Sequence, residues 1–314
     1  MSAKRLFNLT CLALTCASLH AASIGALDLI DKTAGLRNIG TGYAGIAAID
    51  PTYAAHWNPA NIVYAEKQSV ALAYDQQYEA NILTGDSVWL VAPKTPLGFS
   101  VVQSEVSGIP RTEDQNGDPL HTGSFSDTYR NYSITFGTRF NTLALGSTFK
   151  YLTHEIDTYS ANGYGLDLGA RLELTSQVAL GCIYRNILSD ISWSTGTVET
   201  LESKVGVGLS LLDTLGELPL VINADYDIGI TSVEDFWAIG GELWLMPSLL
   251  AMRIGTNAHK DITFGLGVHY HDFITDIAVI FKDKETRLDN VFLFSMGLNF
   301  APPKPESFPW PTQD

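Results

Sequence analysis

Fourteen short segments of this chain alternate apolar residues with small or polar ones at a period of two. In residues 164–174, for example, Leu166 and Leu168 fall on one face and Gly165 and Asp167 on the other. Successive side chains of a strand point to opposite faces, so each segment is predicted to be a β-strand. The predicted strands are 68–74, 85–93, 97–106, 128–139, 142–154, 164–175, 176–188, 200–212, 218–229, 235–246, 248–257, 262–273, 275–282 and 290–300.

The links between these strands favour a membrane barrel over a soluble β-sandwich, which would alternate in the same way. Links after the even-numbered strands are tight, such as 140–142 and 175–177, and the others are longer, up to 105–127. Outer-membrane barrels have short periplasmic turns, long external loops and an even number of strands. Aromatic residues on the apolar faces also gather at two heights, as in the girdles of such barrels. We therefore expect an all-β protein, a transmembrane antiparallel β-barrel of about 14 strands in the bacterial outer membrane.

The N-terminus and the composition agree with export. Lys4 and Arg5 precede the apolar stretch 6–19, and small residues follow it, so residues 1–21 are predicted to be a signal peptide cleaved between 21 and 26. No later run is long and apolar enough for a membrane helix. The formal net charge of −15 argues against nucleic acid as a partner.

The sequence carries no catalytic or cofactor-binding pattern. It contains neither G-x-S-x-G nor H-E-x-x-H. Residues 40–45 fit G-x-G-x-x-G, but no apolar strand precedes them and no βαβ alternation follows. Cys182 is the only cysteine after the signal peptide and lies on an apolar strand face. We expect a protein that is not an enzyme and uses no cofactor.

The segment 22–66, before the first predicted strand, does not alternate as a barrel strand would. Its closely spaced glycines suit a compact plug that turns inside a narrow lumen. The segment resembles the N-terminal hatch of the FadL family of outer-membrane channels for hydrophobic compounds, together with the related PorV/PorQ group. The resemblance predicts a hatch over 22–66 and a barrel over 67–300. The matching residues are Gly35, Arg37, Gly40, Gly42, Asp50, Ala54, Trp57, Asn58, Pro59 and Ala60.

The resemblance implies a monomeric channel for uptake of hydrophobic small molecules, such as long-chain fatty acids or hydrocarbons. Ligand would be captured at the external loops, bound in an apolar pocket and released sideways through the wall after the hatch rearranges. From their predicted faces, the candidate ligand-binding residues are Trp57, Val221, Phe236 and Trp244. The alternative is a PorV-like protein that binds protein partners in secretion or surface attachment, which the short external loops favour. An open general porin comes third, because the hatch should plug the lumen.

Five charged residues are predicted to face the lumen. Arg171 with Asp167 and Glu173 would form cross-strand ion pairs that fill or gate the pore. Asp225 and Asp227 would line its external half. Outer-membrane lipid and a hydrophobic ligand are the expected partners of such a barrel.

Two groups of polar residues have side chains of the kinds that bind metal ions. His269 and His271 would share the lumen face of the twelfth strand, but no third ligand can be named. Asp114, Asn116 and Asp118 resemble the opening of a calcium loop, although the glycine and the downstream glutamate of an EF-hand are missing. We predict polar lumen lining and a solvated turn instead of a metal site.

The C-terminal region combines two features. Residues 291–300 resemble the β-signal that the outer-membrane insertion machinery reads, with Phe300 as its terminal aromatic. Residues 301–314 contain five prolines and cannot continue a strand ladder, so a Pro-rich periplasmic tail is predicted. This tail would be a simple extended end or a docking segment for a periplasmic partner.

Overall fold

The computed structural model describes residues 34–77, 83–92, 95–115, 118–230, 234–283 and 291–299. The predicted signal peptide, residues 22–33 of the hatch segment and the tail at 301–314 lie outside these described residues. Phe300, the terminal aromatic of the predicted β-signal, lies outside them as well.

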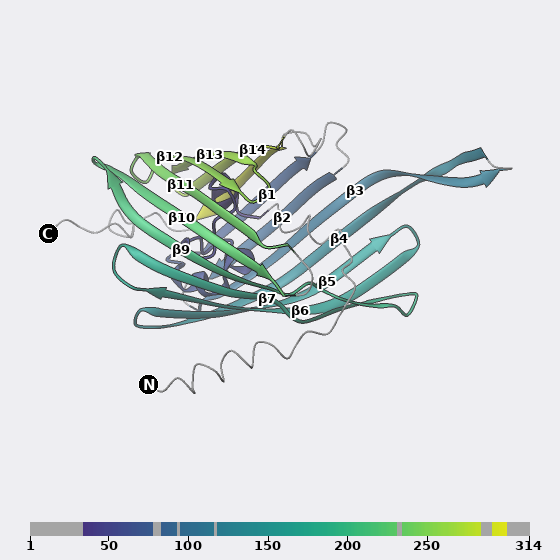
Figure 1. Cartoon of the computed structure of the whole chain (residues 1–314), viewed down its shortest axis with the longest axis horizontal. Helices are drawn as coiled ribbons and strands as arrows, with labels where there is room; N and C mark the ends of the chain where they lie inside the picture. Colours follow the sequence, from purple (N-terminus) through teal and green to yellow (C-terminus); the bar gives the residue numbers. More distant parts are fainter. Residues whose placement is uncertain are drawn as a thin grey trace.

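Fourteen antiparallel strands and one three-residue strand form a single sheet in the described chain (Figure 1). The predicted alternating segments are confirmed as strands, and most boundaries agree within a few residues. The strands are β1 (Ser69–Gln77), β2 (Leu83–Ala92), β3 (Leu97–Gln115), β4 (Asp118–Phe140), β5 (Leu143–Ile156), β6 (Tyr159–Glu173), β7 (Val178–Trp193), β8 (Val198–Thr200), β9 (Lys204–Leu215), β10 (Leu218–Gly229), β11 (Phe236–Met246), β12 (Leu250–Asn257), β13 (Ile262–Tyr270), β14 (Phe273–Phe281) and β15 (Val291–Asn299).

The sheet closes on itself. Each long strand pairs with the next long strand along the chain, and β1 pairs with β15 over Ser69–Gln76 and Phe292–Asn299. The short strand β8 pairs with β7 alone among the described strands, and β9 takes the next place in the barrel. A closed barrel satisfies every ladder position internally, as a hydrocarbon environment requires. The predicted 14-stranded barrel is confirmed.

One predicted loop is a hairpin. The link 105–127 is the longest external loop that the sequence predicts, but β3 and β4 continue pairing to Gln115 and Asp118. Their ladder shifts register twice, between Val106 and Ile109 and between Arg111 and Thr112. These shifts break the alternation of the sequence, which is why the pattern predicted a loop. The hairpin projects well beyond the other strands (Figure 1).

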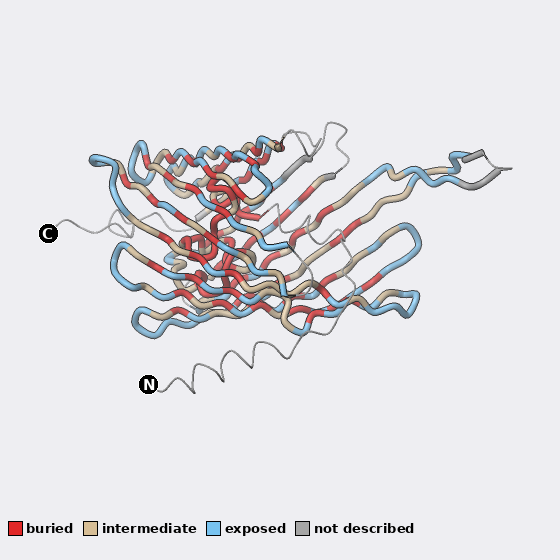
Figure 2. Tube along the Cα trace, viewed as in Figure 1, coloured by how far each residue is buried: buried red, intermediate tan, exposed pale blue. Residues whose placement is uncertain are grey.

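Buried and exposed positions alternate along the strands of the barrel (Figure 2). Many large apolar side chains of the strands are exposed, whereas most small and polar ones are buried toward the lumen. In β6 the alternation follows the prediction, with Tyr164 and Leu168 exposed and Asp167 and Arg171 buried. Cys182 lies on the exposed face of β7. A closed barrel with an apolar outer band is the architecture of bacterial outer-membrane proteins, so the predicted location follows from the fold.

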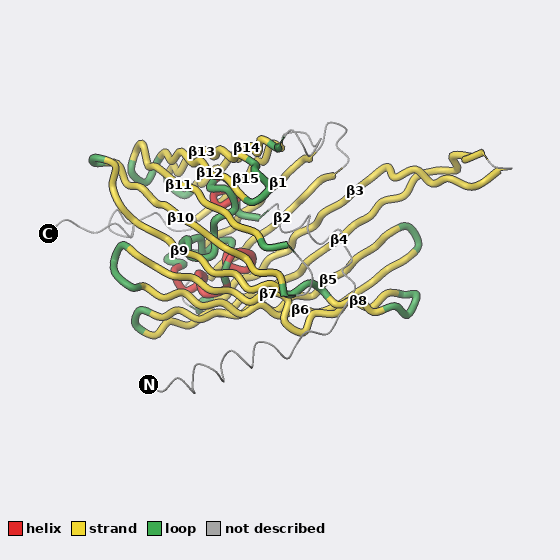
Figure 3. The backbone as a smooth tube through the Cα atoms, in the orientation of Figure 1, coloured by secondary structure: helices red, strands yellow, loops and turns green. Residues whose placement is uncertain are grey.

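The described helices are short and lie inside the barrel (Figure 3). They are α3 (Leu36–Gly40), α4 (Ala54–Trp57) and the 3₁₀ helix η1 (Pro59–Tyr64). None of the described helices is long and apolar enough to cross a membrane.

Candidate functional site

The segment 34–66, called the hatch from here on, fills the lumen nearer to the tight turns of the barrel (Figures 1 and 3). Its helices α3 and α4 bury Leu36, Ile39, Ala54 and Trp57. The amino-acid sequence keeps these helices short, because glycine precedes α3 and Asn58 before Pro59 adopts extended backbone.

The hatch rests on glycines of the barrel wall. A Cβ atom at Gly240 would meet the backbone of Thr41, and one at Gly181 would meet the carbonyl group of Ile46. At these two positions the backbone of the wall lies directly against the backbone of the hatch. Any side chain larger than hydrogen would therefore push the hatch away. We call these wall residues the glycine belt; they are Gly98, Gly137, Gly146, Gly169, Gly181, Gly206, Gly208, Gly240, Gly255 and Gly265.

Asn58 of the Asn-Pro-Ala motif ties the hatch together and to the wall. Its Nδ2 donates to the carbonyl oxygen of Ile46 at 2.8 Å and to that of Ala170 on β6 at 3.1 Å. Its Oδ1 accepts from the backbone N–H of Ala60 at 3.0 Å. Asn58 is fully buried, so an apolar replacement would leave these groups without partners.

Arg37 joins the hatch to a buried chain of charges in the wall. Its Nε and Nη2 donate to Glu242 of β11 at 2.8 and 2.6 Å, a bidentate pair, and its Nη1 donates to the carbonyl oxygen of Ile49 at 2.9 Å. Glu242 also accepts from Arg253 of β12 at 2.7 Å, and Arg253 donates to Asp276 of β14 at 2.5 Å. This chain alternates in charge across three strands, so each charge is paired.

A second set of polar contacts holds the opposite side of the hatch. Asp225 Oδ2 accepts from the backbone N–H groups of Gly45 and Ile46 at 2.6 and 2.8 Å. Arg185 donates to Asp227 at 2.9 Å and to the carbonyl oxygen of Trp57 at 3.2 Å. Of the two aspartates predicted to line the pore, Asp225 therefore binds the hatch directly and Asp227 is linked to it through Arg185.

The other predicted lumen charges are paired as well. Arg171 contacts Glu173 at 3.0 Å and donates to the carbonyl oxygen of Ala47 at 3.0 Å. Asp167 does not pair with Arg171 as expected; it pairs with Lys150 of β5 at 2.7 Å. The prediction was wrong on this pair because Asp167 and Arg171 are four residues apart along one strand, roughly 13 Å at about 3.3 Å per residue, whereas Lys150 reaches Asp167 from the neighbouring strand.

The four predicted ligand-binding residues do not meet in one pocket. Trp244 is buried in the charge chain, with its Nε1 donating to Glu242 at 2.9 Å and its ring 5.0 Å from that of His269. Trp57 is buried inside the hatch, with its Nε1 donating to the carbonyl oxygen of Ala34 at 3.0 Å. Phe236 packs edge-on against Tyr43 at 6.4 Å, and Val221 lines a cavity near the tight turns.

An apolar cluster that the sequence did not single out lies between hatch and wall. Tyr53 of the hatch packs edge-on against Trp89 of β2 with 5.1 Å between ring centres. Trp89 and Tyr129 occupy lumen-facing positions among small or polar residues, and that alternation is the signal that could have identified them. Most wall members of the cluster lie in the halves of their strands nearer the long links; they are Ala71, Trp89, Val102, Tyr129, Leu152, Ala161, Ile191, Ala278, Ile280, Val291 and Leu293.

The candidate metal ligands are not assembled. His271 lies beyond the end of β13, in a turn with φ of 54°, and packs on Tyr270 at 4.4 Å. The expected shared face with His269 is therefore wrong, because the strand ends before His271. Asn116 and the side chains of residues 114 and 118 lie outside what the structure describes. The described residues contain no group of three or more His, Cys, Asp or Glu placed to hold a metal ion.

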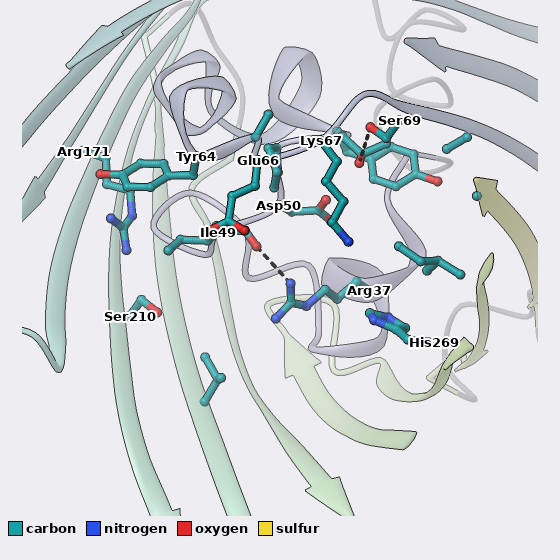
Figure 4. A pocket seen from close by; sticks show the side chains of 18 of the residues that line it. Arg37, Ile49, Asp50, Tyr64, Glu66, Lys67, Ser69, Arg171, Ser210 and His269 are labelled. Carbon is teal, nitrogen blue, oxygen red and sulfur yellow. Dashed lines mark hydrogen bonds between the residues drawn. The ribbon is translucent and has the colours of Figure 1, made fainter. Parts of the chain in front are cut away.

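A cavity of about 670 Å³ lies between the hatch and the tight-turn end of the barrel. Hatch residues Arg37, Asp50 and Tyr64 point into it, and Arg171 and His269 face it from the wall (Figure 4). Its lining is mixed in polarity, unlike the apolar cluster. A polar or amphipathic group fits it better than a purely apolar one.

Comparison with known proteins gives the fold. No protein-family model and no curated protein matches the chain. The toluene transporter TodX of Pseudomonas putida is similar with a TM-score of 0.58 and 14% identity, over 84% of this chain and 96% of that one. A FadL homologue of Pseudomonas aeruginosa gives 0.50 and 13% identity, over 85% of this chain and 98% of that one. The predicted resemblance to the FadL-type fold is confirmed, and the likeness to the PorV/PorQ group stays a prediction.

Proposed function

We propose that this chain, a barrel of the FadL-type fold, is a monomeric outer-membrane channel for the uptake of small hydrophobic compounds and not an enzyme. The observation that carries the proposal is the apolar cluster, which continues from the lumen wall onto Tyr53 and Trp57 of the hatch. Apolar walls with a few polar groups suit a hydrophobic ligand. The similar TodX is described as a toluene transporter, which supports hydrocarbons as candidates beside fatty acids.

Release sideways through the wall is the second part of the proposal. The pairing of β7 with β6 is irregular between Tyr184 and Asp190, where Ile187 alone keeps a partner on β6. Within this interruption Asn186 and Leu188 have φ angles of 57° and 52°. The register with β6 shifts between Tyr164 and Leu168, and the pairing of β7 with β9 ends at Arg185. A non-glycine residue with such a φ marks a strained position that its surroundings maintain.

The hatch contacts the strands on both sides of this interruption. Asn58 donates to Ala170 of β6, and Arg185 of β7 donates to Trp57. On the wall, Lys150 closes the interruption by contacting Asp167 and donating to Asn186 at 2.5 Å. Movement of the hatch would therefore pull on the strands between which a ligand would leave.

The test locks the wall with a disulfide. Leu166 and Ile187 are the one pair of β6 and β7 within the interruption, so Leu166→Cys with Ile187→Cys, in a Cys182→Ser background, would join the two strands there. Uptake of toluene and of a long-chain fatty acid into barrel-containing cells should fall when the pair is oxidised and return on reduction. Met252→Cys with Leu266→Cys, a pair between β12 and β13, is the matched control and should leave uptake unchanged.

Two results would count against the proposal in different ways. Equal uptake by the oxidised and reduced β6–β7 pair would overturn sideways release. No uptake or binding of any hydrophobic compound by the unmodified barrel would overturn the channel itself.

The interaction-protein alternative has one feature in its favour, the projecting β3–β4 hairpin (Figure 1). Arg111 on this hairpin forms an ion pair with Asp157 in the β5–β6 turn, which holds its base. Replacing residues 107–126 by a short turn should leave uptake intact under the channel proposal. Loss of surface attachment of a partner without loss of uptake would favour the alternative.

A further inference from the structure

The neighbouring strands β2 and β3 carry three buried polar groups that have no hydrogen-bond partner within the described chain. They are Nε1 of Trp89 and the hydroxyl groups of Ser87 and Ser100. The three residues are 2%, 4% and 1% exposed, so solvent does not reach them. Folded proteins rarely leave buried polar groups unpaired, and three of them on two adjoining strands indicate a binding role.

These three side chains form one patch on the lumen face, which we call the lumen polar patch. Trp89 and Ser100 are directly opposite each other in the β2–β3 ladder, and Ser87 is two residues before Trp89 on the same face of β2. Side chains that are directly opposite have Cβ atoms about 4.5–5.5 Å apart, and diagonal ones about 7–8 Å. A single oxygen atom can therefore be within reach of the indole N–H and a serine hydroxyl group.

The buried hydroxyl groups on the next strands are paired with one another. Ser133 of β4, which is opposite Ser100, donates to Asn131 at 3.0 Å. The hydroxyl groups of Thr135 and Thr148 are 2.8 Å apart across β4 and β5. This wall can thus satisfy hydroxyl groups internally, and the lumen polar patch departs from that arrangement.

The positions that flank the lumen polar patch on β1 and β3 are apolar. Ala71 and Ala73 of β1 are the ladder partners of Trp89 and Ser87. Val102 of β3 is the partner of Ser87. A carboxylate bound here would find no cation at these flanking positions, and the burial of an unpaired charge is costly. An uncharged hydroxyl group fits, because its oxygen can accept from the indole N–H and its proton can be donated to a serine oxygen.

A phenol ring of the hatch already lies against the lumen polar patch. The ring of Tyr53 packs edge-on against Trp89, with 5.1 Å between ring centres. The hydroxyl group of Tyr53 is hydrogen-bonded to Ser295 of β15 and leaves the patch unsatisfied. A ligand phenol in place of Tyr53 could keep the aromatic contact with Trp89 and pair the polar groups beside it.

We propose that the lumen polar patch is a subsite for the uncharged hydroxyl group of a phenol, which binds when Tyr53 moves away from Trp89. The assignment rests on the proposed channel function and narrows its substrate class. A site whose buried polar groups stay unpaired without the right ligand discriminates strongly against an analogue that lacks the hydrogen-bonding group. A hydroxylated aromatic compound is therefore preferred over the plain hydrocarbon and over the carboxylate.

The test compares three ligands that share one ring: toluene, p-cresol and p-toluate. Their binding to the purified barrel in detergent is measured by equilibrium dialysis, with empty micelles as the blank. The parent should bind p-cresol about tenfold more tightly than either other compound, or ~1.4 kcal/mol. Trp89→Phe and Ser100→Ala should each abolish most of this preference and leave the affinity for toluene unchanged. Ser133→Ala, whose hydroxyl group is already paired with Asn131, is the matched control and should keep the preference.

The indole N–H gives a direct readout of the contact. In an isotope-labelled barrel, the NMR signal of the Trp89 indole N–H, identified by its loss in Trp89→Phe, should move on addition of p-cresol and stay in place with toluene. Equal affinity for toluene and p-cresol, or a preference that survives both Trp89→Phe and Ser100→Ala, would overturn the subsite and leave the channel standing. No binding of any of the three compounds would overturn the subsite and count against the channel as well.

Discussion

Asn58 and Ile46 are joined by a hydrogen bond of 2.8 Å between the side-chain amide nitrogen and the carbonyl oxygen. The bond connects the two halves of the hatch, because Ile46 follows α3 and Asn58 precedes η1. At the same point Ile46 lies on Gly181, and Asn58 reaches the carbonyl oxygen of Ala170. The internal structure of the hatch and its attachment to the wall thus depend on one side chain.

Asn58→Ala is expected to loosen the hatch while leaving the barrel closed. The change removes four side-chain hydrogen bonds and leaves buried groups without partners, at about 1–3 kcal/mol for each such group. Ion conductance in planar bilayers and protease cleavage after residue 34 should both increase. Asn131→Ala on β4, which removes a bond to Ser133, should change neither. Low conductance in both variants would contradict this role of Asn58.

Gly240→Ala is expected to displace the hatch, and Gly241→Ala is not. A Cβ at Gly240 meets the backbone of Thr41, whereas at Gly241 the nearest atom is the carbonyl oxygen of Val221 at 3.6 Å. Overpacking of this kind costs about 1–3 kcal/mol. Conductance and the hydrogen exchange of the hatch amides should both be higher in Gly240→Ala than in Gly241→Ala. If both alanines behave alike, the glycine belt is not what seats the hatch.

Glu242→Gln is expected to destabilise the hatch more than Arg37→Met. The first change leaves the buried Arg253 and the partly buried Arg37 facing a neutral amide, whereas the second leaves Glu242 paired with Arg253. Breaking a buried ion pair from one side costs about 3–5 kcal/mol. The temperature at which the hatch is released, measured as a rise in conductance, should be lower for Glu242→Gln than for Arg37→Met. The reverse order would show that the wall charges are satisfied without Glu242.

The hatch is expected to be more firmly seated at pH 4 than at pH 7. Burial raises the pKa of Asp50 to about 6, against the opposing effect of Arg37 and with a further rise from Asp276. The seated hatch therefore retains a proton that a released segment would lose near pH 4. The stabilisation is full below about pH 4 and is lost as the pH rises through 6, at about 1.4 kcal/mol per pKa unit.

Asp50→Asn supplies the control for this pH dependence. The amide cannot ionise, so hydrogen exchange of the hatch should depend less on pH between 4 and 7 than in the parent. The same slope in both proteins would assign the effect to another group.

The barrel could be predicted from the sequence because the alternation of apolar and polar residues identifies each strand without knowledge of its neighbours. Strand β10 begins and ends at the predicted residues, 218 and 229, and the exposed and buried faces of β6 match its sequence. The pattern failed where the ladder is irregular, at the shifted register of β3 and β4 and at the end of β13 before His271.

The interior of the barrel was harder to predict. Alternation shows that Trp244 faces the lumen, but not that Glu242 of the same strand and His269 of β13 surround its ring. Such contacts depend on the relative heights of strands that are distant in sequence. The hatch itself was predicted by its motif, yet the partners of Arg37 and Asn58 required the full register of the barrel.

The glycine belt also imposes an order on assembly. Its members are distributed over nine strands from β3 to β13, so no single hairpin or half-barrel offers the hatch a complete seat. A nascent barrel with a missing or misregistered strand would stay unplugged. We therefore expect the hatch to be seated late in biogenesis, after the wall around it has formed.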